Sequence, residues 1–108
     1  MLRSKIEDTL LSFGACDPST LGFNYIVDAT ILAVEQPDAL KSFTKTLYPT
    51  VANQNRSTSS RVERAIRHAI EKIYLYGDME RVTELLGNIA TTNYGKPTNS
   101  AFTQTVRW

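Results

Sequence analysis

Hydrophobic residues recur at helical spacing along most of the chain. Ile6, Leu10 and Phe13 form an i, i+4, i+7 series, and Gly14 follows as a left-handed helix cap. No convincing stretch alternates with the period of two that a half-buried strand shows. The pattern therefore predicts an all-α fold, a compact bundle of about six helices that forms one domain over residues 1–108.

Proline and small polar residues predict where the next helices begin. Asp17 and Pro18 form a candidate N-cap followed by a proline at the first helical position, and Asp38 is a second candidate cap. The second helix should stop before Pro37, and Pro49 opens a short fourth helix. The predicted inner positions of these helices are Leu21, Tyr25, Ala29, Leu32, Leu40, Phe43, Leu47, Val51 and Ala52.

A long helix is predicted over about residues 59–76. A polar segment precedes it, in which Thr58 and Ser59 are both good N-caps, and Gly77 interrupts it. Another amphipathic helix follows and is roughly closed by Gly87; residues 91–96 read as a loop, and Pro97 opens a final helix. The amphipathic pattern of the first of these helices comes from Met79, Val82, Leu85, Leu86 and Ile89, and Phe102 and Val106 are expected to face inward in the second.

The long helix has two distinct faces when its residues are placed about 100° apart on a helical wheel. One arc holds the apolar residues Val62, Ala65, Ile66, Ala69, Ile70, Ile73 and Tyr76. The opposite arc holds the polar residues Ser60, Arg61, Glu63, Arg64, Arg67 and His68. Only Tyr74 and Leu75, at the C-terminal end, depart from this division.

The formal net charge of +1 conceals an uneven distribution. Residues 1–54 hold four basic and six acidic side chains (−2), residues 55–72 hold five and two (+3), and residues 73–108 hold three of each. Positive charge concentrated in one segment favours binding to a polyanion. A solvated helix face with pairs of Arg67 to Glu63 and Glu71 is the alternative interpretation, and on charge alone it is the simpler one.

The content of the polar face favours DNA. Three arginines within seven residues repel one another, and an anion would complete the arrangement. Arginine can bind the O6 and N7 edge of guanine with two donors, and glutamate can accept from cytosine N4. Because a recognition helix presents its N-terminal residues to the bases, we predict base contacts by Arg61, Glu63 and Arg64.

The residues before this helix suit the DNA backbone. The small side chains of Ser57, Thr58, Ser59 and Ser60 allow backbone N–H groups at the helix N-terminus to approach a phosphate. The preceding short helix and polar turn supply the first half of a helix-turn-helix. Double-stranded DNA is therefore the predicted partner.

Composition excludes several other classes of protein. Hydrophobic residues make up 42% and charged residues 21%, which is ordinary for a globular domain, and no apolar run approaches the ~20 residues of a membrane span. Glu7 and Asp8 interrupt the N-terminus before any apolar block, unlike a signal peptide. The single Cys16 fits a reducing compartment. We expect a cytoplasmic, nucleoid-associated domain with no membrane partner.

Nothing in the sequence supplies a catalytic or metal site. His68 has no nucleophile or orienting carboxylate near it in sequence, and Cys16 has no cationic neighbour. One histidine and one cysteine exclude the ligand cluster of a structural zinc site. Tyr25 and Tyr48 are interpreted as core or core-edge residues, and Asp17 as a helix-start residue. We therefore expect no enzyme activity, metal or cofactor.

Three segments carry a resemblance to a known family: SRVERAIRHAIE (residues 60–71), LYP (47–49) and KPTNSAF (96–102). In order and spacing they closely resemble the C-terminal effector domain of stage 0 sporulation protein A, the response-regulator transcription factor that starts endospore formation. The similarity spans essentially the whole chain, and the twelve-residue run is highly specific.

This resemblance implies a helix-turn-helix domain that binds a short DNA box, often as tandem head-to-tail copies. It implies that Ser60, Arg67 and His68 lie against the DNA backbone or groove edge, beside base-reading Arg61, Glu63 and Arg64. It also implies regulation through a sigma subunit of RNA polymerase. The segment 77–89 matches the sigma-contacting region in position, with Glu80, Arg81 and Glu84 as its exposed candidates.

Two departures leave alternatives open. Members of the family carry a phosphorylated receiver domain, for which these 108 residues have no room. We expect either an excised effector domain or a stand-alone relative free of phosphorylation control. Residues 53–56 replace a segment expected to contain lysines and an aromatic residue, so phosphate affinity is either weaker or supplied by Arg56. A protein-interaction module of the same fold, binding a sigma factor or a full-length paralogue, is the alternative function.

Overall fold

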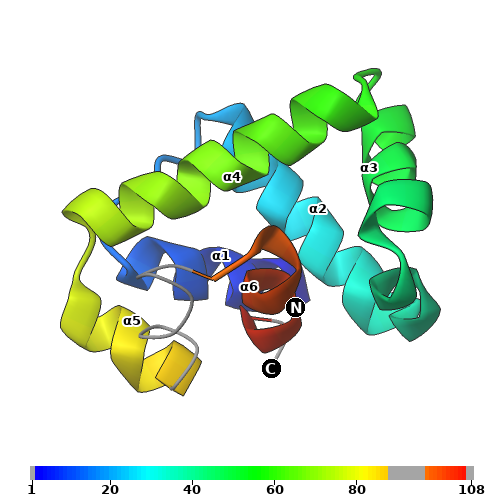
Figure 1. Ribbon diagram of the computed structural model, residues 1–108. Coiled ribbons are helices and arrows are strands. Elements are labelled where there is room, and N and C mark those ends of the chain that lie inside the picture. The colour runs from blue at the N-terminus through cyan, green and yellow to red at the C-terminus, as the bar shows by residue number, and fades with distance from the viewer. Residues whose placement is uncertain (1, 88–96, 107–108) are drawn as a thin grey trace.

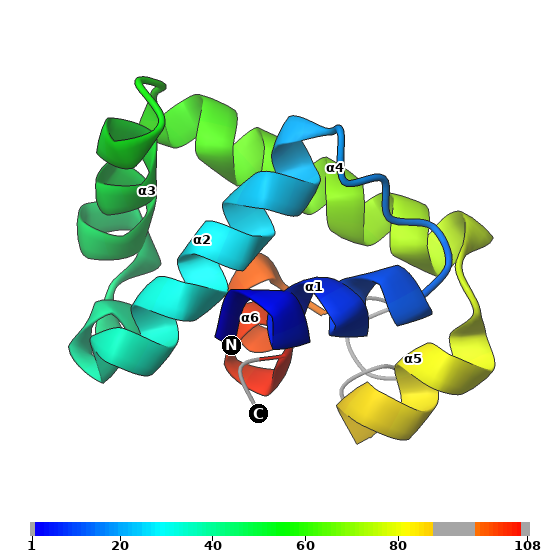
Figure 2. The same ribbon diagram turned by 180° about the vertical axis from the view of Figure 1, so that it is seen from behind.

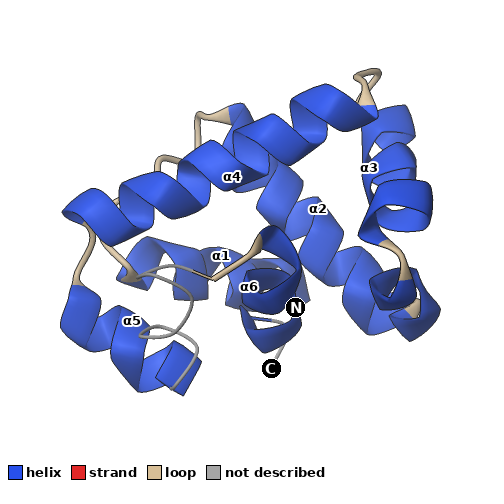
Figure 3. Ribbon diagram, viewed as in Figure 1, coloured by secondary structure: helices blue, strands red, loops and turns tan. Residues whose placement is uncertain are grey.

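The computed structural model describes residues 2–87 and 97–106 of the chain. This part is built from six α-helices, a short 3₁₀-helix and a π-helical turn, with no strand (Figure 3), which confirms the all-α prediction. The longest helix, α4 (Ser59–Tyr76), lies along one side of the molecule and crosses α2 (Leu21–Glu35). Helices α1 (Leu2–Ser12) and α6 (Asn99–Val106) lie beneath it (Figure 1).

Two short helices lie at opposite ends of α4. Helix α3 (Tyr48–Gln54) packs beside its N-terminal half, and α5 (Met79–Leu86) follows its C-terminal end, as both views show (Figures 1 and 2). The 3₁₀-helix η1 (Pro37–Lys41) and the π-helical turn η2 (Phe43–Leu47) connect α2 to α3. Helix α4 is therefore supported along its length while one side faces outward.

Helix α4 packs against the core through a single stripe of apolar residues. Val62, Ile66, Ile70 and Ile73 are each no more than 1% exposed and pack toward α2, α3 and α6. Burying an aliphatic side chain of this size contributes roughly 1.5–3 kcal/mol. The predicted division of this helix into a buried apolar face and an outer polar face is therefore confirmed along most of its length, and the outer face is left to solvent.

A glycine sets how closely α2 and α4 cross. A Cβ atom added to Gly22 would lie 2.5 Å from the Ala65 carbonyl oxygen and 2.9 Å from the Ala69 Cβ atom. Atoms do not approach this closely without displacing one another, so only glycine fits. This contact fixes the depth at which α4 sits on the bundle, and hence how far its outer face projects.

A tight turn joins α3 to α4. The Ser57 N–H donates to the Ala52 carbonyl at 2.8 Å and the Arg56 N–H to that of Asn53 at 3.4 Å, which together form a Schellman motif. Arg56 takes the left-handed conformation that this motif requires, with φ of 52°. The Thr58 hydroxyl then caps α4 by accepting from the Arg61 N–H at 3.2 Å. Thr58, and not Ser59, is therefore the cap.

The predicted start of α2 is wrong. Helix α2 begins at Leu21, after Thr20, whose hydroxyl accepts from the Phe23 N–H at 3.4 Å. Asp17 instead accepts from the backbone N–H and the hydroxyl of Ser19, and these bonds lower the pKa of its carboxyl group. Leu21 was predicted to be an inner residue but is 66% exposed, because the next two residues of α2, Gly22 and Phe23, are the ones that face the core.

The predicted third helix is also wrong in detail. Asp38 caps nothing; it lies within η1 and pairs with Lys41 at 3.4 Å. A separate cap, Ser42, accepts from the Lys45 N–H at 3.2 Å and begins η2. The segment is therefore two short pieces, and the inward positions Phe43 and Leu47 belong to the second.

The ends of the later helices show smaller differences. Tyr76, predicted to face inward, is 78% exposed because it is the last residue of α4, beyond the packed stripe. Gly87, with φ of 58°, ends α5 as predicted. Helix α6 begins at Asn99, and the Thr98 hydroxyl accepts from the Ala101 N–H at 3.1 Å. Ile89 and the predicted loop 91–96 lie outside the described residues.

Candidate nucleic-acid interface

The outer face of α4 carries the predicted cationic residues. Arg61, Arg64, Arg67 and His68 are all exposed, on the side opposite the buried stripe. Within residues 2–87 and 97–106, the guanidinium groups of Arg61 and Arg64 have no hydrogen-bond or ion-pair partner. Their donors are therefore available to an external ligand.

The position of Arg61 opposes the helix dipole. The first turn of α4 contains Arg61 and no acidic residue. A cation at a helix N-terminus is unfavourable by about 0.3–1 kcal/mol, because the exposed N–H groups there carry partial positive charge. Free N–H groups and arginines at one helix end together form a strongly electropositive surface, which is suited to an anion.

Arg67 is partly engaged within the helix. Its Nε atom lies 3.5 Å from the Glu63 Oε1 atom, one of the pairs expected from the solvated-face interpretation. Both side chains are partly exposed, and ion pairs in such positions contribute no more than about 1 kcal/mol. Arg67 can therefore exchange this carboxylate for a phosphate at little cost.

Two grooves flank the arginines. The first, here called the α3 groove, is lined by Thr44 and Tyr48 on one side and by the start of α4 on the other. The second, the α2 groove, runs past Leu21, Arg56 and His68. Arg61 and Arg64 line both grooves, so these two side chains form the ridge between them.

The residues predicted to contact the backbone lie on the walls of these grooves, except for Thr58, which caps α4 beside them. Ser59 and Ser60, in the first turn of α4, line the α3 groove, and the exposed Arg56 lines the α2 groove. The Thr58 oxygen already accepts the capping bond, so its hydroxyl hydrogen remains for a ligand. The structure thus gathers all the predicted DNA-contacting residues around the N-terminal half of α4 and the turn before it.

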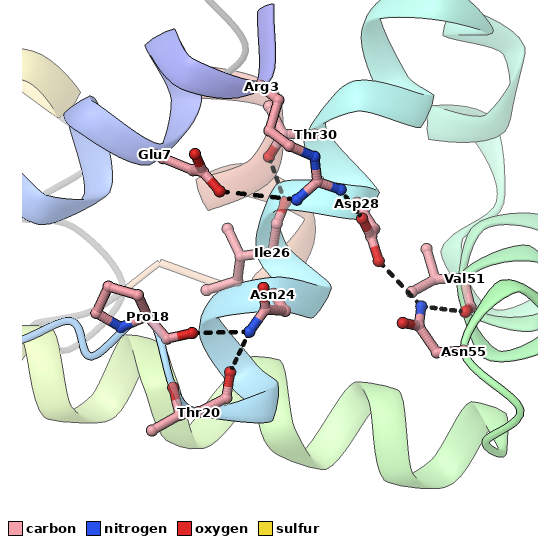
Figure 4. Close-up of polar contacts among 10 residues, drawn as sticks. All are labelled: Arg3, Glu7, Pro18, Thr20, Asn24, Ile26, Asp28, Thr30, Val51 and Asn55. Atoms are coloured by element: carbon pink, nitrogen blue, oxygen red, sulfur yellow. Dashed lines mark hydrogen bonds and ion pairs between the residues drawn. The ribbon is translucent and has the colours of Figure 1, made fainter.

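A carboxylate on α2 holds the turn before α4. Figure 4 shows Asp28 between two partners: its Oδ2 atom accepts from the Asn55 side-chain amide at 3.0 Å, and its Oδ1 atom accepts from Arg3 of α1 at 2.5 Å. The same Asn55 amide donates to the Val51 carbonyl at 2.8 Å. Asp28 therefore links α1, α2 and the residue preceding Arg56. This link could not be predicted from the sequence, because no local pattern pairs residues so far apart.

A second link joins α6 to both helices of the predicted DNA-binding unit. The Asn99 side-chain amide donates to the Tyr48 hydroxyl oxygen at 3.0 Å and to the Glu63 carbonyl oxygen at 3.2 Å. Tyr48 and Asn99 lie in two of the three segments that carried the family resemblance, which was the available signal for this contact. From the sequence, Tyr48 was predicted only to lie in the core or at its edge.

The expected sigma-contacting residues differ among themselves. Glu80 and Glu84 are exposed on α5. Arg81 is only partly exposed and is engaged within the domain: its Nε atom donates to the Ser12 hydroxyl at 3.1 Å, and another guanidinium nitrogen lies 3.6 Å from Glu84. Arg81 thereby ties α5 to the end of α1.

Residues 2–87 and 97–106 contain no group of three or more His, Cys, Asp or Glu side chains placed to hold a metal ion. None of the helices described there is both long and apolar enough to span a membrane. Burial raises the pKa of the Cys16 thiol to about 11, as suits a packed residue and not a nucleophile.

The family model for "Sporulation initiation factor Spo0A C terminal" matches residues 6–107. The chain belongs to this family. The family is the DNA-binding domain of a sporulation transcription factor, a response-regulator effector, and is not a family of enzymes. The match includes α3, the turn, α4 and α6, so both grooves belong to a Spo0A-type DNA-binding domain.

Proposed function

We propose that this Spo0A-type domain binds double-stranded DNA in a sequence-specific manner, with α4 in the major groove, and regulates transcription of sporulation-type genes. The observation that carries the proposal is the ridge of Arg61 and Arg64, exposed and without partners among the described residues. The opposite, apolar face of α4 packs into the core and holds the helix in place. Rigid placement of bidentate donors is what base reading requires.

Each side chain has a separate role in this proposal. Arg61 and Arg64 each bind the O6 and N7 atoms of a guanine, and the Glu63 carboxylate accepts from a cytosine N4 amino group. Glu63 becomes available when Arg67 exchanges it for a phosphate. The backbone and groove-edge contacts come from Arg56, Thr58, Ser59, Ser60, Arg67 and His68.

We extend the proposal to the assembly on DNA. Exposed Glu80 and Glu84 on α5 offer carboxylates to a sigma subunit of RNA polymerase, and they lie away from the arginine ridge, at the other end of α4. A tandem head-to-tail pair of domains on adjacent boxes, acting on the nucleoid in the cytoplasm, rests on the family resemblance.

Selection from a random duplex pool tests the proposal. The immobilised protein is incubated with the pool at a fixed, stated salt concentration, and bound duplexes are sequenced over successive rounds. We expect a short shared box to emerge, bound 10³-fold or more tightly than unrelated DNA. A pool that stays random while binding remains salt-sensitive would show electrostatic attachment without sequence reading.

A second candidate function rests on exposed apolar residues. Leu75, Tyr76 and Met79 are large hydrophobic side chains exposed at the junction of α4 and α5. Exposed apolar clusters mark protein-binding surfaces. A module that binds a sigma factor or a full-length paralogue would capture that protein while its DNA affinity stayed non-specific, with Kd ~10⁻⁴–10⁻⁶ M.

A further inference from the structure

The Tyr48 hydroxyl is held at the wall of the α3 groove with an unused hydrogen. Tyr48 is the first residue of α3 and is only 8% exposed, and its ring packs edge-on against Phe43 with centroids 5.6 Å apart. Its oxygen accepts from the Asn99 amide at 3.0 Å. Among the described residues, no acceptor takes the hydroxyl hydrogen in return.

The Asn99 amide fixes this arrangement. The same nitrogen donates to the Glu63 carbonyl at 3.2 Å, so the amide is anchored on α4 as well as on Tyr48. Because the amide group is a donor at this contact, the hydroxyl hydrogen must point away from it, and Tyr48 lines the α3 groove. Burial raises the pKa of Tyr48, so the hydroxyl keeps its hydrogen at neutral pH.

The α3 groove is rich in donors. Besides Tyr48 it is lined by the hydroxyl-bearing residues Thr44, Ser59 and Ser60 and by the guanidinium groups of Arg64 and Arg67. Glu63 is its one acidic lining residue, and that carboxylate is paired with Arg67. Hydroxyl and guanidinium donors around one hollow match the three-dimensional array of acceptors on a phosphate.

We propose that the α3 groove binds one phosphate of the DNA backbone, with the Tyr48 hydroxyl as its donor from α3 and Arg67 and Ser60 as its donors from α4. This rests on the proposed DNA binding. The first helix of a helix-turn-helix crosses the DNA backbone, and Tyr48 begins that helix. Asn99 is then a positioning residue, because its amide holds the Tyr48 hydroxyl against the Glu63 backbone of α4.

Tyr48→Phe removes the hydroxyl and keeps the ring. Because the lost hydrogen bond is to a charged group, we expect affinity for DNA to fall about ten-fold. Fluorescence anisotropy measures this loss on a duplex recovered by the selection and on an unrelated duplex, and the two losses should be equal. The salt slope should stay unchanged, because a neutral donor releases no counterion, whereas Arg67→Ala should lower it by about one. Tyr74→Phe is the matched control, since its buried hydroxyl has no partner among the described residues; it should leave binding unchanged.

Making Tyr48→Phe in a protein that already carries Asn99→Ala distinguishes two roles of the hydroxyl: donating to a phosphate, and only holding Asn99 in place. If the hydroxyl donates to DNA, Tyr48→Phe still weakens binding in that background. If it acts only by holding Asn99, the second change adds nothing, and the proposal is overturned. Melting temperatures of all variants show whether folded fractions are comparable at the binding temperature.

A scan with neutral methylphosphonate linkages tests the site with the unaltered protein. One linkage should weaken binding of the wild type and abolish the difference between wild type and Tyr48→Phe. No such linkage, or unchanged affinity of Tyr48→Phe, overturns the phosphate site. If, in that case, Arg64→Ala still lowers affinity for the selected duplex, base reading by α4 is supported and only the phosphate site is rejected. If selection finds no box but Tyr48→Phe weakens all binding, the phosphate site stands alone.

Discussion

The Asp28 carboxylate accepts a hydrogen bond from the Asn55 side chain at 3.0 Å, which ties the middle of α2 to the turn between α3 and α4. The other oxygen of the same carboxylate holds Arg3, so α1 is part of the connection. Asn55 directly precedes Arg56 and lies three residues before Thr58, the cap of α4. The placement of the proposed DNA-reading helix therefore depends on a polar link to the N-terminal helix as well as on its own buried stripe.

Asp28→Ala should lower the free energy of unfolding by about 1–2 kcal/mol, because it removes a charge-assisted hydrogen bond to Asn55 and an ion pair at once. Urea denaturation followed by circular dichroism measures the change. Arg3→Ala is the matched control: it leaves the Asn55 bond in place and should cost less than 1 kcal/mol. Equal losses for the two variants would show that the Asn55 bond contributes nothing.

Arg56→Gly should move folding and DNA binding in opposite directions. Arg56 occupies a left-handed position with φ of 52°, which costs a non-glycine residue roughly 1–2 kcal/mol, while glycine adds entropy of about 0.5–1 kcal/mol to the unfolded chain. The free energy of unfolding should therefore stay equal or rise by up to about 1.5 kcal/mol. Affinity for all duplexes should fall and the salt slope should drop by about one. Unchanged DNA binding would place Arg56 outside the interface.

Gly22→Ala should be destabilising, although alanine ordinarily favours a helix over glycine by about 1 kcal/mol. The new Cβ atom would meet the Ala65 carbonyl oxygen at 2.5 Å, and overpacking of this kind costs about 1–3 kcal/mol. Thermal unfolding measures the loss. Adding Ala69→Gly relieves only the contact at 2.9 Å, so rescue should be partial. A stabilised Gly22→Ala protein would mean that α2 and α4 lie farther apart than described.

Cys16 should alkylate slowly at neutral pH. Burial raises the pKa of its thiol to about 11, and only the thiolate reacts. In the folded protein, the rate of alkylation by iodoacetamide should rise with pH and reach its midpoint at about pH 11. In the urea-unfolded chain, the midpoint should lie at the ordinary pKa of a thiol. Because only the unfolded thiol ionises between these two values, stability should fall as pH rises through that window. A folded-state midpoint at the ordinary value would contradict the packed placement.

The sequence predicted what local patterns determine. The bounds of α4, its two faces and its cap at Thr58 or Ser59 follow from periodicity and capping chemistry within a few residues. The same rules failed at Asp17 and Asp38, because several polar residues competed for each cap: Thr20 begins α2, and Ser42 begins the turn before α3.

Contacts between distant residues were not predictable in this way. Asp28 meets Asn55, Tyr48 meets Asn99, and Arg81 meets Ser12 across separations of 27, 51 and 69 residues. Each pair depends on how whole helices pack, and no local spacing encodes it. The bonds that hold the Arg81 side chain and the Tyr48 hydroxyl were consequently not predictable from the sequence.

The affinity of Arg64→Ala for the selected duplex tests most directly whether the arginine ridge reads DNA. We expect a loss of about 1–3 kcal/mol on that duplex, with relaxed preference at one base position, whereas Arg67→Ala should weaken binding to every sequence alike. Unchanged affinity of Arg64→Ala for the selected duplex at the same salt concentration would contradict base reading by α4.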